Sequence, residues 1–302
     1  MTDLSIIIVT YNPGPILFDC LSSLPDGAGT LDYEVLVVDN NSTDGVPHAA
    51  AEQHPKMRFI FNRDNRGFAG ANNQGLELVQ GRYLLLLNPD VIVEPVSLQA
   101  LVEFLEATPS AGIAGPRTLD GSGQVTLTAH TDYKPPVILW QYLGLDRLLP
   151  NRVYGRYRRA CETAAEPFPV AWVQGCCLLL RRAVYEQIGG LDEEFFLFAE
   201  EPDFCDRAQR AGWSTWFIPA ARVHHLESTS VKRYHEARIR SYHLSPLHYF
   251  RKRGQVGAMG VLKIGFTLEL GLKAIVRLSQ RDGERVRVYG RVVRAVWVFE
   301  SV

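Results

Sequence analysis

The chain has 302 residues, of which 46% are hydrophobic and 22% are charged, as expected of a globular protein with one large domain or two small ones. The net charge of −1 hides an uneven distribution, because residues 1–231 hold 17 Lys and Arg against 28 Asp and Glu, whereas residues 232–302 hold 15 against 5. The five cysteines include no Cys-x-x-Cys pair, which excludes a disulfide framework and indicates a reducing compartment.

The N-terminus leads directly into a predicted strand at residues 5–9. This apolar run is too short for a signal peptide and has no basic segment before it. No uninterrupted apolar stretch is long enough to span a bilayer. We therefore expect a cytoplasmic protein.

Strand and helix patterns alternate through the first 90 residues. Apolar runs of strand length occur at 5–9, 33–38, 57–61 and 83–87, and helical patterns lie between them at 15–24, 45–53 and 67–79. This alternation predicts an α/β fold with a mostly parallel, Rossmann-like sheet and helices on both faces.

Polar residues follow each of these predicted strands. They are Thr10 and Asn12, Asp39 and Asn41, Asn62 and Asn65, and Asn88 and Asp90. The carboxyl ends of parallel strands share one edge of a sheet, so this row outlines a nucleotide site. Neither Gly-x-Gly-x-x-Gly nor a P-loop motif follows the first strand, which disfavours a dehydrogenase and a P-loop NTPase.

The most informative stretch is the leucine run at 84–87 followed by Asn88-Pro89-Asp90. Pro89 cannot donate to a strand ladder, so the strand ends there and leaves Asp90 at the sheet edge. A carboxylate in this place can hold a divalent cation against the phosphates of a nucleotide. The alternative is an ordinary turn, because Asn-Pro-Asp also favours turns.

These motifs together resemble glycosyltransferase family 2, which has the GT-A fold. The segments that carry the resemblance are Val9-Thr10-Tyr11-Asn12, the run from Val37 to Gly45, Asn65-Arg66-Gly67-Phe68-Ala69, Asn73 and Leu87-Asn88-Pro89-Asp90. The similarity spans about residues 4–231 and is greatest to the rhamnosyltransferase-like branch.

The resemblance implies inverting transfer of a sugar from a nucleoside diphosphate to a hydroxyl of a saccharide or lipid-linked saccharide. The expected reaction moves rhamnose from dTDP-rhamnose to a cell-envelope glycan or a polyprenyl-diphosphate-linked saccharide. The residues that the resemblance assigns to the donor are Thr10, Asn12, Asp39, Asn41, Asn65, Gly67, Asn73 and Asn88. Asp90 would bind Mn²⁺ or Mg²⁺, and Asn88 stands in the first place of the more familiar Asp-x-Asp pair.

Residues 189–207 contain seven carboxylates, and Pro202 fits the first turn of a helix. The family usually reads Glu-Asp-x-Asp here, with the second residue as general base. That place is Glu201 in this chain, and Asp203 is the fallback. We expect Glu200, Trp172 and Gly175 on the acceptor side, the last two within a strand over 170–182.

An edge strand is predicted at 213–218, and a segment that resembles the family's Ala-x-Val-x-His follows it. Counting from Ala221 makes His225 the second metal ligand and Ser230 the associated serine, with His224 as the alternative ligand. An imidazole, a carboxylate and phosphate oxygens together suit Mn²⁺ and tolerate Mg²⁺.

The basic tail contains a long helical pattern at 256–278. Its charged residues, Lys263, Glu269, Lys273 and Arg277, fall within an arc of roughly 120°. This predicts an amphipathic helix on an anionic membrane surface, with its basic residues toward the lipid. The alternatives are packing on the catalytic body and a homodimer contact.

A nucleic-acid partner is not expected, because the tail lacks interleaved stacking aromatics. Residues 284–298 fit either a strand or a helix. We divide the chain into a GT-A domain at 1–231, with a nucleotide-sugar half at 1–115 and an acceptor half at 116–231, and a basic extension at 232–302.

Two other functions compete with the transferase. A non-catalytic nucleotide-sugar-binding protein would explain Glu201 in place of Asp. A sugar-1-phosphate nucleotidyltransferase would carry a basic, glycine-rich loop after the first strand, and residues 9–14 contain no Lys or Arg.

Overall fold

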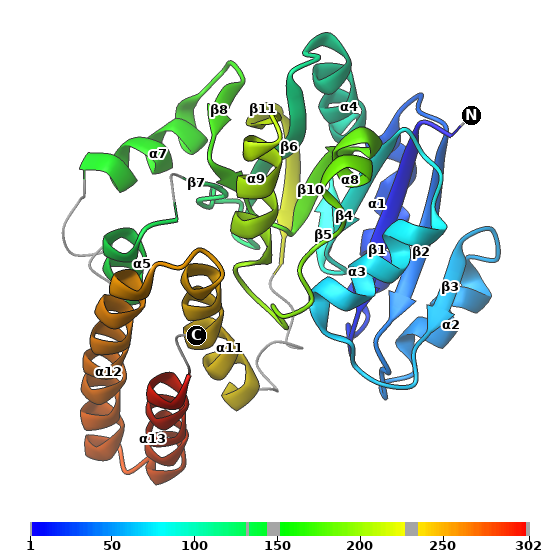
Figure 1. The fold of residues 1–302 in the computed structure, drawn as a ribbon. Helices are drawn as coiled ribbons and strands as arrows, with labels where there is room; N and C mark the ends of the chain where they lie inside the picture. The colour runs from blue at the N-terminus through cyan, green and yellow to red at the C-terminus, as the bar shows by residue number, and fades with distance from the viewer. Residues whose placement is uncertain (1, 131–132, 144–151, 227–234, 300–302) are drawn as a thin grey trace.

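The computed structural model describes residues 2–130, 133–143, 152–226 and 235–299 (Figure 1). The strands are β1 (Leu4–Thr10), β2 (Tyr33–Asp39), β3 (Arg58–Phe61), β4 (Tyr83–Leu87), β5 (Val91–Val93), β6 (Ala111–Leu119), β7 (Ala129–His130), β8 (Phe168–Val170), β9 (Trp172–Val173), β10 (Cys177–Arg181) and β11 (Ser214–His225). The helices are α1 (Ile16–Ala28), α2 (Val46–Gln53), α3 (Gly67–Leu78), α4 (Ser97–Ala107), α5 (Pro135–Tyr142), α7 (Arg152–Thr163), α8 (Arg182–Ile188), α9 (Glu200–Arg210), α11 (His235–Arg251), α12 (Val256–Ser279) and α13 (Gly283–Val298).

One nine-stranded sheet organises the molecule, with the order β3-β2-β1-β4-β10-β6-β11-β5 and β8 paired to β11. Strands β3, β2, β1 and β4 are parallel, as predicted. Strand β10 then runs antiparallel to β4 and β6, so the second half of the sheet is mixed. The α/β class and the helices on both faces are confirmed.

The central strands are mostly apolar because helices cover both faces of the sheet. Ile6 and Ile8 pack into the core that contains Leu17 of α1 and Leu101 of α4. Ile7, between them, packs into the opposite core with residues of α3, α8 and α9. The period of two along a strand therefore sends alternate side chains of one apolar run to two different layers.

Two predicted strands differ from the structure. Residues 213–218 are not an edge strand, because β11 continues to His225 and lies between β6 and β5. The predicted strand over 170–182 is divided into the end of β8, then β9 and β10. The break falls at Gly175, whose backbone N–H bonds a side chain of α9 instead of a neighbouring strand.

The C-terminal helices α11, α12 and α13 form a bundle beside the sheet domain (Figure 1). Its core also contains Ile138 of α5 and Phe195 and Ala199 of the segment before α9. Residues 284–298, left open by the sequence pattern, lie within α13. Among the described helices, none has the length and apolar character to cross a membrane.

The predicted orientation of α12 is wrong. Glu269 is buried and pairs with His243 and Lys273, and Lys263 donates to the carbonyl of Phe299. The side of α12 that carries Lys263 and Glu269 thus faces the bundle, while Lys273 reaches Glu269 from a half-exposed position. An apolar face is left outside.

Candidate active site

Asp90 and His225 meet at the carboxyl edge of the sheet. The Nε2 atom of His225 lies 3.2 Å from Oδ1 of Asp90, and both side chains are largely buried. Asn88 contributes its amide nitrogen 3.5 Å from the same Nε2. Strand pairing fixes this geometry, because His225 of β11 lies opposite Val91 of β5, directly after Asp90.

The pair fits a divalent cation. A carboxylate and an imidazole are donors that Mn²⁺ accepts, and two protein ligands leave coordination positions for phosphate oxygens and water. No cluster of three or more His, Cys, Asp or Glu with metal-binding geometry occurs in the described part of the chain. A cation bound here would therefore take much of its coordination shell from phosphate oxygens and water.

His224, the alternative ligand, belongs elsewhere. Its Nε2 atom lies 2.9 Å from Oε1 of Glu94. Successive residues of a strand point to opposite faces, so His224 and His225 diverge. Ser230 lies outside the described residues.

The donor-side residues at the ends of β1 and β2 form one hydrogen-bonded unit. Asp39 accepts from the hydroxyl of Thr10 at 2.9 Å and from the backbone N–H of Ser42 at 3.1 Å. Asn12 accepts from the N–H of Thr43 at 2.8 Å and donates its own N–H to the hydroxyl of Ser42. Both Asn12 and Asn41 have positive φ, a conformation that asparagine tolerates better than most residues.

A second unit joins β2 to the start of α3. The side-chain amide of Asn40 donates to the carbonyl of Gly67 at 3.0 Å, and Asn65 accepts from the N–H of Gly67 at 2.9 Å. Gly67 has φ of +75°, and a Cβ atom there would lie 2.9 Å from the ring of Phe196. Glycine is required for both reasons, and the contact ties the donor half to the loop before α9.

Asn73 contacts protein groups. Its amide donates to the carbonyl of Leu191 and accepts from the N–H of the same residue, each at 2.8 Å, and it also donates to Glu193. These bonds hold the acidic loop of residues 189–199 against α3. The contact between Asn73 and the donor stays a prediction, and the structure shows that Asn73 shapes this loop.

Glu201, the predicted base, is linked through residues 175 and 176 to Asn88, which contacts His225. Its Oε1 atom accepts from the N–H of Gly175 at 2.8 Å, and the next carbonyl, that of Cys176, accepts from the N–H of Asn88. Burial raises the pKa of the Cys176 thiol to about 12, and the charges of Asp90 and Glu201 add to this effect.

Glu200 and Glu201 are adjacent at the N-terminus of α9. Burial raises the pKa of Glu200 well above its ordinary value, and the neighbouring charge of Glu201 raises it further. Burial also raises the pKa of Glu201, although the Gly175 N–H partly offsets this. Oε2 of Glu200 has no hydrogen-bond partner among the described residues. Burial and the mutual repulsion of the two carboxylates therefore favour one shared proton on the pair, and the pKa of Glu200 is raised the more strongly.

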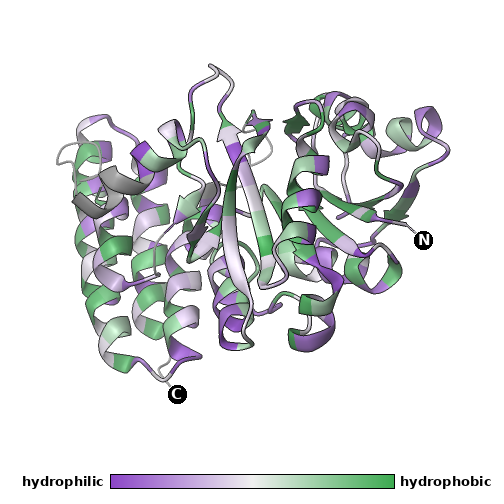
Figure 2. Cartoon of the chain, turned by 90° about the horizontal axis from the view of Figure 1, so that it is seen from above, coloured by the Kyte–Doolittle hydropathy of each residue, from purple (hydrophilic) through white to green (hydrophobic). Residues whose placement is uncertain are grey.

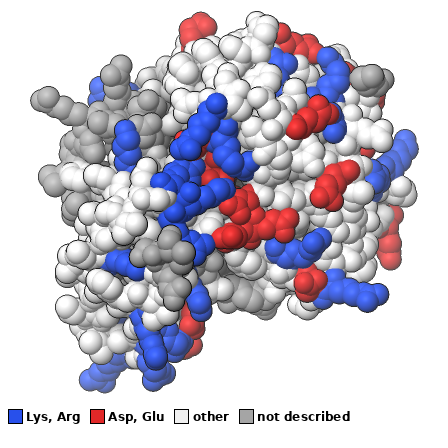
Figure 3. All heavy atoms as spheres, in the orientation of Figure 1, with Lys and Arg blue, Asp and Glu red and all other residues white. Residues whose placement is uncertain are grey.

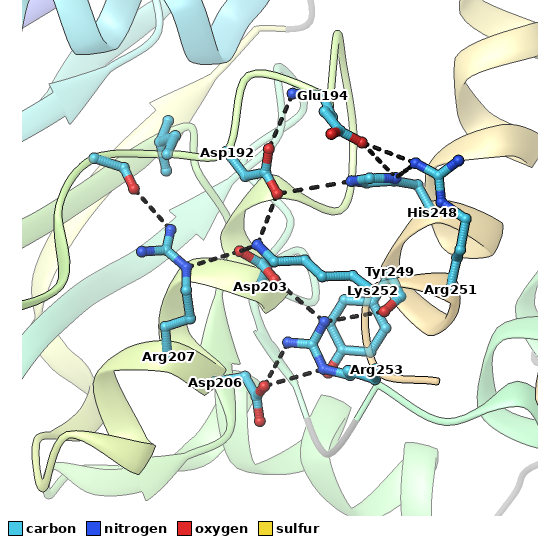
Figure 4. A network of polar contacts seen from close by, with 12 residues as sticks. Asp192, Glu194, Asp203, Asp206, Arg207, His248, Tyr249, Arg251, Lys252 and Arg253 are labelled. Atoms are coloured by element: carbon cyan, nitrogen blue, oxygen red, sulfur yellow. Dashed lines mark hydrogen bonds and ion pairs between the residues drawn. The ribbon is translucent and has the colours of Figure 1, made fainter. Parts of the chain in front are cut away.

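Asp203 is surrounded by cations (Figure 4). Its fully buried carboxylate contacts Arg207 at 2.9 Å, Lys252 at 3.1 Å and Arg253 at 3.2 Å. Arg207 also donates to the carbonyls of Ile188 and Gly190. Through these contacts Asp203 joins α9, the acidic loop and the residues at the end of α11.

The acidic loop has its own contacts with α11. Lys252 donates to Asp192 at 2.7 Å, while His248 and Arg251 lie 3.2 and 2.8 Å from Glu194 (Figure 4). Figure 3 shows the resulting surface, with Lys and Arg gathered beside Asp and Glu near the centre of the face. The basic tail therefore does contact its own acidic body, through the last turn of α11 and the residues that follow.

Trp172 of β9 lies against α9. Its ring stacks on His130 with centroids 3.8 Å apart, and it lines a crevice of about 290 Å³ with Pro202, Tyr249 and Arg253. The indole nitrogen has no partner among the described residues.

Sequence reasoning missed several residues that shape the site. Asn40 lies within the segment from Val37 to Gly45 that carries the family resemblance, and its position directly after a predicted strand was the signal. Phe196, Lys252 and His248 had no such signal, because their partners lie far away in the chain.

Residues 5–189 match the family model described as "Glycosyl transferase family 2". The chain is 32% identical over 300 residues to N-acetylglucosaminyl-diphospho-decaprenol L-rhamnosyltransferase of Mycobacterium tuberculosis, covering 94% of this chain and 97% of that protein. It is 29% identical over 214 residues to the low-salt glycan biosynthesis hexosyltransferase Agl10 of Haloferax volcanii, covering 70% of this chain and 62% of that one.

Solved structures support the fold. The mannosyltransferase PcManGT from Pyrobaculum calidifontis, in complex with GDP-Man and Mn²⁺, gives a TM-score of 0.57 at 18% identity and covers 99% of this chain and 76% of its own. The structure of GalNAc-T7 with UDP, GalNAc and Mn²⁺ gives a TM-score of 0.53 at 16% identity and covers 74% of this chain and 43% of its own.

Proposed function

The chain belongs to glycosyltransferase family 2, and on this basis we propose that it transfers rhamnose from dTDP-rhamnose, with inversion, to a saccharide on a polyprenyl diphosphate. The acceptor class follows the name of the mycobacterial relative, whose similarity covers nearly the whole of both chains. We place the reaction at the inner face of the cell membrane, where a polyprenol-linked acceptor would reside.

The observation that carries the proposal is the contact between Asp90 and His225 at the sheet edge, together with the hydrogen bonds that link Glu201 to the strand end before Asp90. Asp90 and His225 are 3.2 Å apart, and Glu201 is joined to Asn88 through hydrogen bonds to residues 175 and 176. A cation site and a candidate base thus flank the ends of β4 and β10.

In this scheme Glu201 acts as general base. Its carboxylate accepts the proton of an acceptor hydroxyl while the oxygen attacks the anomeric carbon and the nucleoside diphosphate leaves. A neutral Glu200 allows Glu201 to stay ionised beside it. Asp203 serves as a positioning residue, because three cations already occupy its carboxylate.

Asp90 and His225 would hold Mn²⁺ or Mg²⁺, which when bound neutralises charge on the departing diphosphate. Thr10, Asn12, Asp39 and Asn41 would line the nucleoside end of the donor, and Asn65, Gly67, Asn73 and Asn88 would lie along the rest. We keep Trp172, Gly175 and Glu200 on the acceptor side, with Gly175 leaving room for the base. A side chain there would lie 2.6 Å from Oε1 of Glu201.

A non-catalytic binding protein of the same fold is the second candidate, favoured only by Glu201 in place of Asp. A protein that binds a nucleotide sugar with metal but neither transfers nor hydrolyses it would establish this alternative. A nucleotidyltransferase is disfavoured by the absence of Lys and Arg from residues 9–14.

A thermal-shift panel with Mn²⁺ and the nucleotides dTDP, UDP and GDP tests the donor assignment. We expect stabilisation by dTDP that is lost when Mn²⁺ is chelated. A response to UDP alone would refute the rhamnosyl assignment while leaving the family intact.

A further inference from the structure

The outer face of α12 is an exposed apolar stripe. Of the sixteen large hydrophobic side chains that are exposed among the described residues, eight lie on α12 and two on α13. The eight residues of α12, exposed by 50 to 65%, are Val256, Val261, Ile264, Leu268, Leu272, Ile275, Val276 and Leu278. Hydrophobic residues recur along the helices of this bundle, at the left of Figure 2.

The stripe follows the helical period. At about 100° per residue, Val261, Ile264, Leu268, Leu272 and Ile275 fall within an arc of roughly 80°, and the charged residues of α12 all lie outside it. The buried side of the helix holds Met259, Leu262, Phe266 and Leu270. A soluble helix normally has one apolar face; α12 has two, and the protein covers only one of them.

An exposed tryptophan adjoins the stripe, and two exposed arginines lie on the same side of α13. The indole nitrogen of Trp297 donates to the hydroxyl of Thr267 on α12 at 2.9 Å, so its exposed ring adjoins the stripe. Arg287 and Arg294 share the exposed side of α13 with Trp297, and neither pairs with a carboxylate among the described residues. Apolar side chains with a tryptophan and arginines at the rim match the polarity of an anionic membrane surface.

We propose that the outer face of α12 inserts into the interfacial layer of an anionic bilayer, with Arg287 and Arg294 on lipid headgroups. A second copy would present the same stripe and the same cations, and so would offer no complementary negative charge. Only the activity assay below depends on the proposed function. Binding to vesicles needs neither donor nor acceptor.

Co-sedimentation of the full chain with vesicles tests the stripe. The vesicles are phosphatidylcholine alone, or phosphatidylcholine with 30 mol% phosphatidylglycerol, at about 0.1 M salt. The variant is Leu268→Gln with Leu272→Gln, and the matched control is Leu78→Gln, an exposed leucine at the end of α3 (42% exposed). We expect the partition coefficient to fall at least tenfold in the double variant and to be unchanged in the control.

The variant Arg287→Gln with Arg294→Gln tests the charge component. We expect it to lose about tenfold in binding to the phosphatidylglycerol vesicles while binding to phosphatidylcholine is unchanged. An unchanged preference for the anionic vesicles would refute the headgroup assignment.

Light scattering coupled to size-exclusion chromatography measures the oligomeric state and so tests the alternative that a second copy of the chain covers the stripe. A dimer that dissociates in the Leu268→Gln/Leu272→Gln variant, with no vesicle binding by the wild type, would overturn the proposal in favour of a second copy. Transfer to a water-soluble, short-chain prenyl diphosphate acceptor should be equal in this variant and the wild type. Failure of the wild type in that assay would count against the proposed function and not against the membrane face.

Discussion

The backbone N–H of Gly175 donates to Oε1 of Glu201 at 2.8 Å, and this contact joins the two halves of the site. Gly175 precedes Cys176, whose carbonyl accepts from Asn88 beside the Asp90 and His225 pair. A break between β9 and β10 thus links the candidate base to the candidate cation site.

The first prediction concerns metal ligation. In Asp90→Asn and His225→Ala, we expect the Mn²⁺ concentration for half-maximal donor binding to rise about tenfold to a hundredfold, because each loses one of two protein ligands. His224→Ala is the matched control, since His224 bonds Glu94 instead. Isothermal titration of dTDP across a Mn²⁺ series measures the effect, and equal responses of the two histidine variants would contradict the assignment.

The second prediction separates backbone strain from steric clash. Gly45 and Gly67 both have φ of +75°, but a Cβ atom at Gly45 meets nothing within 4 Å, whereas one at Gly67 meets Phe196. We expect Gly45→Ala to lower the free energy of unfolding by about 1 kcal/mol and Gly67→Ala to lower it by more. Denaturant unfolding measures both values, and Gly67→Ala should in addition weaken donor binding.

The third prediction concerns the buried acid Asp203. Arg253→Gln removes a cation that is itself only 8% exposed, so we expect a loss of about 3 kcal/mol in the free energy of unfolding. Adding Asp203→Asn should restore part of this loss, because the buried side chain that has lost one of its three cations is then neutral. Strict additivity of the two single changes in denaturant unfolding would refute the coupling.

The fourth prediction concerns pH. The pKa of Glu200 is raised by burial and by Glu201, so the folded state keeps this proton to higher pH than the unfolded chain does. The free energy of unfolding therefore declines as pH rises above the ordinary value of 4.5. We expect Glu200→Gln to leave stability unchanged near pH 4 and to raise the melting temperature increasingly above pH 5. A constant difference across pH would contradict the buried, protonated assignment.

The position of Asp90 could be predicted from the sequence because strand ends in an α/β sheet share one edge, whereas His225 was expected only from the resemblance to the family's Ala-x-Val-x-His segment, with His224 as the alternative. The parallel arrangement of β1 to β4 could also be predicted, because apolar runs of strand length that alternate with helical patterns are compatible with few sheet topologies. The extent of β11 could not be predicted, because Pro219 and Ala221 interrupt the strand pattern while the register shift between Ile218 and Arg222 preserves the pairing.

The contacts of the C-terminal helices were beyond the sequence for a different reason. Lys252 and Asp203 are 49 residues apart, and no periodicity links them. The helix α12 is apolar on both sides, so its pattern could not show which side is buried. The structure shows that Glu269 faces inward, because it pairs with the buried His243 of α11. A charged residue of α12 can therefore lie on the buried side when the bundle supplies its partner.

The most direct test of the central claim is a single-turnover assay with dTDP-rhamnose and N-acetylglucosaminyl-diphospho-prenol, run on the wild type and on Glu201→Gln. We predict rhamnosylated product from the wild type, and a rate at least a hundredfold lower from Glu201→Gln with donor affinity unchanged. Full activity in Glu201→Gln would contradict the account, because the base would then lie elsewhere.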